Sequence, residues 1–369
     1  MSISFNERMY SISPYMSYLL YLYEKMSDRV FPQELEIPND AWCDYVDSIY
    51  LATGQYPPVK SVSDRFELPV LDVRDDNRGI MIGFSGGRDS TLCTTFLQEL
   101  GYRPVLMKVK GVNKAYPGEV QAAQRVADKL NAELIIQEFA YSGKADYVEN
   151  PVKNHLILAM MIQEMYERDI FRACLGVFPV NLKYEDTRVE GVSDNYERMK
   201  LLEKAIQHTF PRFRFVVCFE DRTKEFLYLV TRHRELMQDY QSCMTPDRYR
   251  KNIRKHVEEK YGIKVAENMC LSCWKCCIDY LHLSVFGFIP LRKDILDGQV
   301  YPTLRRVYAR GRNLPENSKI DVPMATMLDD FMNVQSMRKY CAEGLGHLHE
   351  DLIQDFRKYN PEEISDEQS

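Results

Sequence analysis

The sequence lacks a hydrophobic run long enough to cross a bilayer, and the apolar, tyrosine-rich stretch at residues 15–26 is too short and too polar to do so. It also lacks an excess of basic side chains: 54 aspartates and glutamates outnumber 48 lysines and arginines, and the formal net charge is −6. No basic segment followed by an apolar stretch, as in a secretory signal, opens the chain. We therefore expect a cytoplasmic protein without a membrane partner, and the charge disfavours nucleic acid as a partner.

Internal repeats and low-complexity tracts are absent too, which disfavours solenoid and fibrous architectures. The 369 residues are 45% apolar and 28% charged, as in globular domains, and suffice for two or three structural units. Ten cysteines in a reducing compartment indicate a metal site or catalysis wherever they cluster. The cysteines that are isolated in the sequence are expected to be buried thiols: Cys43, Cys93, Cys174, Cys218 and Cys341.

Strand and helix patterns alternate from about residue 76 to residue 222. The sequence predicts strands at 80–84, 105–109, 134–139, 173–177 and 215–218, with helices at 90–100, 119–130 and 154–168. Short apolar strands separated by helices are typical of a parallel, doubly wound sheet. We therefore predict an α/β fold with a mostly parallel sheet, in which ligands bind outside the carboxyl ends of the strands.

The segments around this α/β domain are predicted to be helical additions. Residues 1–75 would form an N-terminal extension, 223–290 a helical region with a cysteine cluster, and 291–369 a C-terminal extension. Helices are expected at 16–25, 39–51, 223–239, 246–261, 324–339 and 347–359, with an N-cap at Asn39 or Asp40 and a loop at 54–64.

The run GFSGGRDST, residues 83–91, separates the first predicted strand of the α/β domain from an amphipathic helix pattern. Gly86 and Gly87 let the backbone turn and approach a ligand where a Cβ atom would clash. The first N–H groups of a helix lack intrahelical partners and carry partial positive charge, so an anion can bind there. Asp89 could cap the helix or hold a cation. The run matches neither a Walker A loop nor GxGxxG, so it is predicted to be a phosphate-binding loop of another kind.

Four cysteines lie close together in the run MCLSCWKCC. Cys270, Cys273 and Cys276 have C-x2-C-x2-C spacing, and thiolates so close in a reducing compartment can converge on one soft ion. A tetrahedral zinc site needs a fourth ligand, for which Cys243 is preferred over Cys277, because neighbouring residues rarely point at the same ion. An iron–sulfur cluster also takes four cysteines, so zinc and iron–sulfur both remain open.

The loop resembles the SGGxDS loop of the PP-loop ATP pyrophosphatases, which cleave ATP to AMP and pyrophosphate. Over residues 78–280, roughly, the order of motifs is similar to that of one PP-loop family, the 7-cyano-7-deazaguanine synthases (QueC). These motifs are the loop, NPVKN at 150–154, LG at 175–176, acidic turns through Asp186 and Asp194, DRTK ending at Lys224, SC at 242–243, and the cysteine cluster. The loop and the cysteines are the specific parts of this resemblance.

The resemblance implies a doubly wound PP-loop fold of the HUP type, an ATP-dependent C–N ligase, and the ligands ATP, Mg²⁺ and Zn²⁺. It implies that the carboxylate of 7-carboxy-7-deazaguanine is adenylated, that ammonia gives the amide, and that a second ATP leads to the nitrile. The implied nucleotide-binding residues are Ser85, Gly86, Gly87, Arg88, Asp89, Ser90, Thr91 and Asn154. The implied catalytic residues are Asp89, Lys153 and Lys224, the substrate residues are Asp186 and Asp194, and the zinc ligands are Cys243, Cys270, Cys273 and Cys276.

The chain departs from this family in the regions that choose the substrate. The family lacks the first 75 or so residues and the last 80 or so, and its Tyr-Gly-Gln run is replaced here by KGVNKAYPGE. Enlarged homologues occur in bacterial anti-phage operons, including the cyclic-oligonucleotide (CBASS) type, and this chain resembles them. The acceptor of the activated deazaguanine carboxylate is therefore either ammonia or an amine of a partner protein from the same operon. A homodimer is a further expectation by analogy.

Two other functions fit parts of the sequence. A sulfur-transfer enzyme of the same superfamily would use cysteines or an iron–sulfur cluster to modify an adenylated nucleic acid, although the acidic net charge argues against it. A non-catalytic scaffold would keep the fold without the chemistry, although the intact loop with Asp89 argues against that.

Overall fold

The computed structural model describes residues 14–26, 31–52, 54–74, 77–110, 119–138, 153–175, 196–219, 222–240, 243, 245, 247–311, 324–329 and 331–365. These residues belong to two compact units. The first unit draws on 1–85, 93–113 and 127–218, and the second on 86–92, 114–126 and 219–369. Within the part of the chain that is described, no helix combines the length and the apolar composition needed to span a bilayer.

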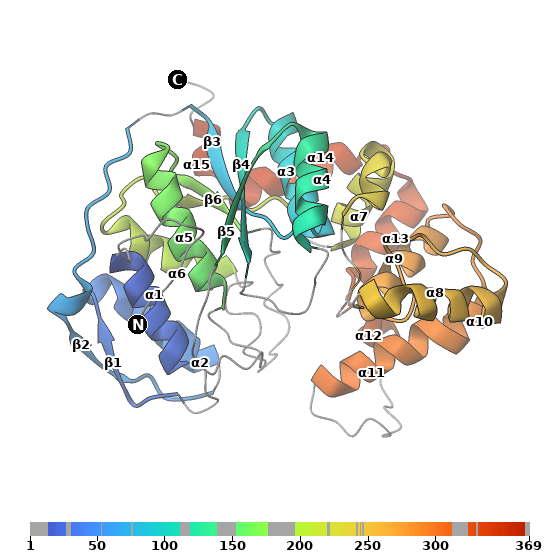
Figure 1. The fold of residues 1–369 in the computed structure, drawn as a ribbon, viewed down its shortest axis with the longest axis horizontal. Coiled ribbons are helices and arrows are strands. Elements are labelled where there is room, and N and C mark those ends of the chain that lie inside the picture. Colours follow the sequence, from blue (N-terminus) through green and yellow to red (C-terminus); the bar gives the residue numbers. More distant parts are fainter. Residues whose placement is uncertain are drawn as a thin grey trace. The chain divides into compact units, whose positions relative to one another are not determined.

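A five-stranded parallel sheet forms the centre of the first unit (Figure 1). Its strands are β3 (Gly79–Gly83), β4 (Arg103–Lys110), β5 (Glu133–Glu138), β6 (Arg172–Cys174) and β7 (Arg214–Phe215), in the order β5-β4-β3-β6-β7. Every neighbouring pair is parallel. The predicted α/β class with a mostly parallel sheet is therefore confirmed, and each predicted strand of the domain overlaps an observed one.

The strand order reverses at β3. From β3 the chain moves outward through β4 to β5, then returns to the other side of β3 to form β6 and β7. In open α/β sheets the crevice beside such a reversal, outside the carboxyl ends of the strands, is where ligands bind. The run that was singled out in the sequence leaves β3 at this end, where the Phe84 N–H donates to the Met107 carbonyl at 2.8 Å, and it leads into α3 (Arg88–Glu99).

Helices of the first unit pack against the sheet and against one another. α5 (Lys153–Glu167) contacts β3, and α6 (Tyr196–Gln207) contacts β7. α1 (Pro14–Lys25) packs on α5, and α2 (Cys43–Ala52) packs on α6, so the N-terminal helices form a second layer (Figure 1). The remaining helix of the α/β region is α4 (Glu119–Leu130), whose bounds agree with the prediction.

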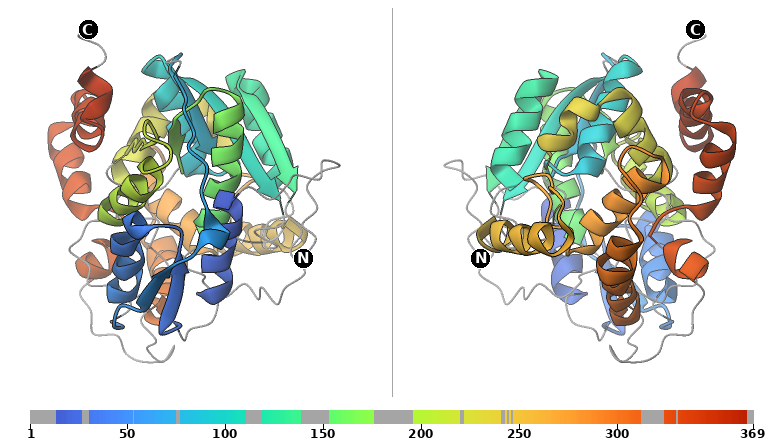
Figure 2. Two further views of the ribbon diagram at one scale, coloured as in Figure 1. Left: turned by 90° about the vertical axis from the view of Figure 1, so that its left-hand side faces the viewer. Right: turned by 90° about the vertical axis from the view of Figure 1, so that its right-hand side faces the viewer.

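The N-terminal segment is not wholly helical, contrary to the sequence prediction. β1 (Glu34–Ile37) and β2 (Val59–Val62) pair in parallel and lie side by side in the blue part of Figure 2. The predicted loop at 54–64 therefore contains a strand. The signal was weak because the side chains of β2 are mostly exposed and its stabilisation comes from pairing with β1. The N-cap prediction is confirmed: Asn39 accepts a hydrogen bond from the Ala41 N–H at 3.1 Å and precedes η1 (Asp40–Trp42). A second short 3-10 helix, η2 (Asp64–Phe66), follows β2.

The second unit consists of helices. They are α7 (Arg222–Arg232), η4 (Arg234–Gln238), α8 (Asp247–Tyr261), α9 (Trp274–Val285), α10 (Lys293–Ile295), η5 (Leu296–Val300), α11 (Tyr301–Gly311), α12 (Met324–Asp329), α13 (Val334–Glu343), α14 (Leu348–Tyr359) and α15 (Glu362–Ser365). The helix that was predicted at 324–339 is broken, because Asn333 caps a new helix by accepting from the Ser336 N–H at 3.0 Å. The sequence prediction missed α9 and α11.

Candidate functional site

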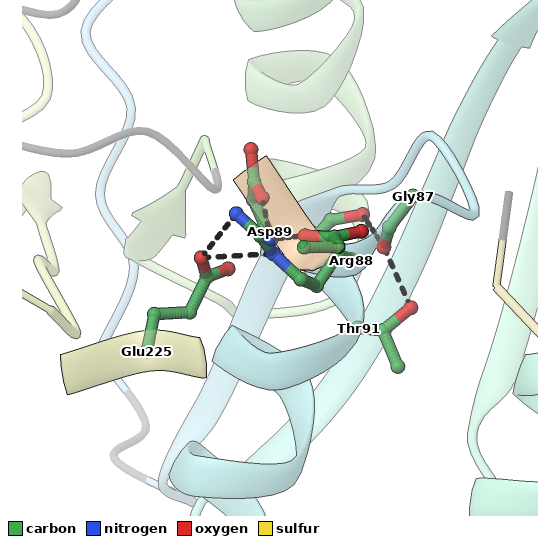
Figure 3. A network of polar contacts seen from close by, with 7 residues as sticks. Gly87, Arg88, Asp89, Thr91 and Glu225 are labelled. Carbon is green, nitrogen blue, oxygen red and sulfur yellow. Dashed lines mark hydrogen bonds and ion pairs between the residues drawn. The ribbon is translucent and has the colours of Figure 1, made fainter. Parts of the chain in front are cut away.

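The loop between β3 and α3 has the backbone geometry that its glycines suggested. Gly86 has a φ of +74°, a conformation that residues with a Cβ atom rarely adopt. The Gly87 carbonyl accepts hydrogen bonds from the Thr91 N–H at 3.1 Å and from the Thr91 hydroxyl at 2.7 Å, which fixes the first turn of α3 (Figure 3). Ser90 donates to the same carbonyl at 3.4 Å, whereas Ser85 is exposed. The first N–H groups of α3 thus follow a tight turn, as an anion site at a helix N-terminus requires.

Arg88 points into the protein rather than toward solvent. Its side chain is 6% exposed, and its Nη2 atom lies 3.0 Å from Glu225 Oε2 on α7. A second buried ion pair joins Arg88 to Asp279 on α9, and Nε lies 3.4 Å from Asp89 Oδ1. Figure 3 shows the Arg88 guanidinium between Glu225 and Asp89. The resemblance assigned Arg88 to nucleotide binding. In the structure its guanidinium is instead paired with carboxylates from two helices that are distant in the sequence.

The carboxyl groups around Arg88 differ in their pKa values. Burial alone would raise the Asp89 pKa, but the positive charges of Arg88, Lys275 and Arg222 lower it below its ordinary value. Burial raises the pKa of Glu225 well above 4.5, and it also raises the pKa of Asp279, in both cases against the effect of Arg88. Asp89 is therefore the carboxyl group of the three whose pKa is lowered, and its side chain is 31% exposed. Such a carboxylate can hold a divalent cation.

Two cations beside Asp89 were not assigned a role from the sequence. Arg222 opens α7 and Lys275 lies in the first turn of α9, and both lower the Asp89 pKa. Both also lie over the ring of Trp274, with centroid distances of 5.2 Å and 5.7 Å. The only sequence signals were their places within DRTK and within the cysteine run. Together they put positive charge beside the loop, which favours a phosphate ligand.

Lys224, assigned to the phosphates by resemblance, is paired with a carboxylate. Its Nζ atom lies 2.6 Å from Asp355 Oδ2 on α14, and both side chains are 11% exposed. The hydroxyl of its neighbour Thr223 forms a hydrogen bond of 3.1 Å with the Nε2 atom of His282 on α9. Consecutive residues at the start of α7 therefore connect to different helices of the same unit.

The side chains of the remaining residues that the resemblance implied, Lys153, Asn154, Asp186 and Asp194, lie outside the part of the chain that the structure describes. Lys153 and Asn154 are the first two residues of α5 in the first unit, and only their backbone is described. Asp186 and Asp194 lie outside the described residues.

We expect Lys224→Met to lower the free energy of unfolding by about 2–3 kcal/mol, because it removes the ammonium group that pairs with the nearly buried Asp355 carboxylate. Asp355→Asn should cost a similar amount, and the double variant Lys224→Met/Asp355→Leu should regain part of the loss. Urea unfolding measures these differences. An ATP KM that rises in Lys224→Met but not in Asp355→Asn would show instead that Lys224 binds phosphate.

Four cysteine sulfurs converge in the second unit. The Sγ atoms of Cys243, Cys270, Cys273 and Cys276 all lie within 4.8 Å of one another. The Cys270–Cys276 and Cys273–Cys243 separations are both 4.0 Å. A tetrahedral zinc ion with Zn–S bonds of about 2.3 Å places its sulfurs about 3.8 Å apart. This arrangement could hold a metal ion.

The backbone geometry between Cys270 and Cys273 favours a thiolate at Cys270, the form that binds a metal ion. Leu271 has a φ of +53°, and the N–H groups of Ser272 and Cys273 both donate to Cys270 Sγ at 3.3 Å. The Thr245 hydroxyl donates to the same sulfur at 3.1 Å. Hydrogen bonds from the neighbouring thiols and from Thr245 lower the Cys270 pKa well below its ordinary value. Cys270 is therefore surrounded by donors that favour the charged ligand form.

The fourth member of the cluster is Cys243, as preferred from the sequence. The Cys277 sulfur instead lies 3.8 Å from the Leu271 carbonyl, and burial raises its pKa to about 12. The hydrogen bond with Cys270 raises the Cys243 pKa, but those with Cys273 and Cys276 outweigh it and bring the value to about 7. All four thiols that converge thus come from the predicted set, and their number and type fit zinc.

A second group of thiols lies in the first unit. Cys93 of α3, Cys174 of β6 and Cys218 have Sγ atoms within 4.8 Å of one another, with 4.0 Å between Cys174 and Cys218. All three are buried, as predicted for the isolated cysteines, whereas Cys341 is exposed and Cys43 is partly exposed, contrary to that prediction. Nothing in the sequence indicated that the three buried thiols meet. Hydrogen bonds from the other two thiols, together with burial, raise the Cys93 pKa well above its ordinary value, and burial does the same for Cys218.

In comparisons with known proteins, no family model matched the chain and no curated protein matched it.

Proposed function

We propose that this protein is an ATP-dependent ligase that forms AMP and pyrophosphate while it activates the carboxylate of a 7-deazaguanine, such as 7-carboxy-7-deazaguanine. The observation that carries the proposal is the SGGRDS loop. It leaves β3 at the carboxyl end, beside the reversal of strand order, and its helix N-terminus bears an ionised Asp89. The motif order that resembles the 7-cyano-7-deazaguanine synthases supports the choice of substrate.

The chemistry needs an activated carboxylate, because a free carboxylate would have to expel oxide. Transfer of AMP from ATP to the carboxylate oxygen releases pyrophosphate and supplies a good leaving group, which an amine then displaces as AMP. In this proposal, the N–H groups at the start of α3 bind the negative charge that builds up on the pyrophosphate. Arg222 and Lys275 supply further positive charge beside Asp89.

Magnesium and zinc would take different sets of residues. Mg²⁺, which binds oxygen ligands, would be held by Asp89 together with the ATP phosphates, and it would neutralise charge on them. Zn²⁺ would be held by Cys243, Cys270, Cys273 and Cys276, whose sulfurs fit a structural site without an open position. The same four cysteines would bind the zinc ion throughout the reaction.

The direct test is to incubate the purified protein with ATP, Mg²⁺ and 7-carboxy-7-deazaguanine, with and without ammonium, and to identify the products by mass spectrometry. AMP with a new amide or nitrile base is the expected result if ammonia is the acceptor. AMP that needs the base but not ammonium would point to an activated carboxylate that awaits another amine. Without AMP in either mixture, deazaguanine carboxylate is excluded as the lone substrate.

Asp89→Asn should lower the rate of AMP formation about 100-fold or more, because it removes the ionised carboxylate proposed to hold Mg²⁺. The matched control is Asp294→Asn, which changes an exposed carboxylate that pairs with Arg292. That variant should keep the wild-type rate. Equal rates for Asp89→Asn and the control would remove Asp89 from the proposed mechanism.

The acceptor of the activated carboxylate is proposed to be either ammonia or an amine on a partner protein. The segments 1–75 and 291–369, which the resembling family lacks, motivate the protein acceptor. Radiolabelled 7-carboxy-7-deazaguanine distinguishes the two, since label on a protein encoded in the same operon would identify a nucleobase–protein amide. Label found only in the free amide or nitrile would leave ammonia as the acceptor.

Sulfur transfer to an adenylated nucleic acid is a second candidate, and the meeting of Cys93, Cys174 and Cys218 favours it. Three thiols could bind an iron–sulfur cluster or carry sulfur. The raised pKa values of Cys93 and Cys218 speak against reactive thiolates in the metal-free state. Stoichiometric iron and a brown colour in protein purified without oxygen would support sulfur transfer, whereas zinc without iron would support the ligase.

A further inference from the structure

The metal centre and the loop are connected through a single helix, α9. Cys273 is the N-cap residue of α9, and Cys276 is in its first turn. Asp279 follows Cys276 by three residues and therefore lies on the same face of the helix. The carboxylate that pairs with Arg88 is thus positioned by the helix that begins with two of the four clustered cysteines.

The Arg88–Asp279 pair is buried, so its geometry matters. The two side chains are 6% and 3% exposed. A buried ion pair offsets the loss of hydration only while both partners stay in place, and a shift of either one leaves a charge without compensation. A displaced α9 would therefore destabilise the position of Arg88, and Arg88 is one residue from Gly87 and one from Asp89 in the loop.

The same helix touches the network at another point. Lys275 of α9 also acts on Asp89. The first two turns of α9 therefore face the loop with two charged residues, and the same stretch carries metal ligands.

The turn that precedes α9 is irregular but anchored: Asn268 donates to the carbonyls of Met237 and Tyr240 at 2.7 and 3.1 Å, and the Leu271 side chain is buried. Residues 266–273 contain no helix or strand, and Leu271 adopts a positive φ. The cluster of sulfurs lies where this turn meets residue 243. A bound metal ion would join these two chain segments, whereas without it four thiols in contact supply only weak hydrogen bonds.

We infer that Arg88 is a positioning residue, which through Asp279 and α9 makes the order of the loop depend on occupation of the four-cysteine metal site. Metal binding fixes the start of α9, α9 holds Asp279, and Asp279 with Glu225 holds the loop by the Arg88 side chain. The coupling itself stands on these contacts alone. Its consequence for nucleotide binding rests on the proposed function.

The test is amide hydrogen exchange, followed by mass spectrometry, of a peptide that covers residues 84–92. Exchange is compared between zinc-loaded protein and protein from which a chelator has removed the metal, with a peptide from α5 as a reference for global unfolding. We expect exchange of the loop peptide to become about tenfold faster or more after metal removal, with the α5 peptide unchanged. Unchanged loop exchange in metal-free protein would overturn the inference.

A variant keeps the test decisive if the metal-free protein unfolds. Asp279→Asn keeps the cysteines and the size of the side chain but removes the ion pair with Arg88. It should retain a full equivalent of zinc and wild-type exchange of the α5 peptide, yet show the faster loop exchange. The control Asp294→Asn, on α10 in the same unit, should change neither quantity. Wild-type exchange in Asp279→Asn with zinc bound would overturn the inference.

Kinetics separate this inference from the proposed function. If the protein forms AMP, Asp279→Asn should raise the KM for ATP several-fold while kcat falls less, because a disordered loop must be reordered by the nucleotide. If no AMP forms with any substrate, the proposed function fails, and the exchange experiment still decides whether the metal orders the loop.

Discussion

Cys270→Ser is expected to abolish stoichiometric zinc binding and to lower the free energy of unfolding of the second unit by about 3 kcal/mol or more. Cys270 accepts hydrogen bonds from the N–H groups of Ser272 and Cys273 and from Thr245, so it is the most strongly supported thiolate of the cluster. Structural zinc sites contribute apparent binding free energies on the order of 10 kcal/mol in small domains, and that energy is lost with the ligand. Metal analysis and thermal unfolding measure the two effects.

The control for this prediction is the neighbouring cysteine. Cys277→Ser should keep a full equivalent of zinc, because the Cys277 sulfur faces the Leu271 carbonyl and not the other four sulfurs. Loss of zinc in Cys277→Ser, with retention in Cys243→Ser, would reverse the assignment of the fourth ligand. Retention of zinc in Cys270→Ser would refute the site as described.

Arg88→Met is expected to destabilise the protein by about 3–5 kcal/mol, the usual cost of leaving buried charge without its partner. Glu225 and Asp279 are 0% and 3% exposed, and Arg88 is the cation that contacts both. A triple variant, Arg88→Met/Glu225→Gln/Asp279→Asn, should regain much of this loss, since neutral amides do not need a buried cation. Chemical denaturation of the single and triple variants provides the measurement.

The pH dependence of Arg88→Met gives an independent check. Burial already raises the pKa values of Glu225 and Asp279 in the presence of Arg88, and removal of the cation raises them further. A carboxyl group with a raised folded-state pKa contributes stability that is complete below its unfolded pKa and is lost as pH rises through the folded value. The difference in stability between Arg88→Met and wild type should therefore shrink as pH falls toward 4.5, the ordinary value for Glu225. A difference in stability that grows as the pH falls would contradict the raised pKa values of Glu225 and Asp279.

Much of the fold could be predicted because its signals are local. The sequence between 76 and 222 carries apolar strands of regular spacing, and the resulting sheet is parallel as expected. The cysteine set was also predictable, since three of its members fall within seven residues of one another. By contrast, β2 was missed because its residues are stabilised by pairing with β1 rather than by burial of their own side chains.

The partners of Arg88 could not be predicted, because they are distant in the sequence. Glu225 is separated from Arg88 by 137 residues and Asp279 by 191. Neither carboxylate stands in a pattern that marks it as buried, and α9 was itself missed. Lys224 illustrates the reverse case: the resemblance gave it a role at the phosphates, whereas its contact with Asp355 appears only once α14 is in place.

The buried orientation of the Arg88 side chain has a consequence for protein engineering. Transplanting the stretch SGGRDS onto a foreign parallel sheet would import a buried guanidinium without its two carboxylate counter-ions. A graft would therefore have to bring equivalents of Glu225 and Asp279, or exchange position 88 for a neutral residue. The unit that can be moved between scaffolds is thus larger than the contiguous motif, and it includes one residue from each of two helices far along the chain.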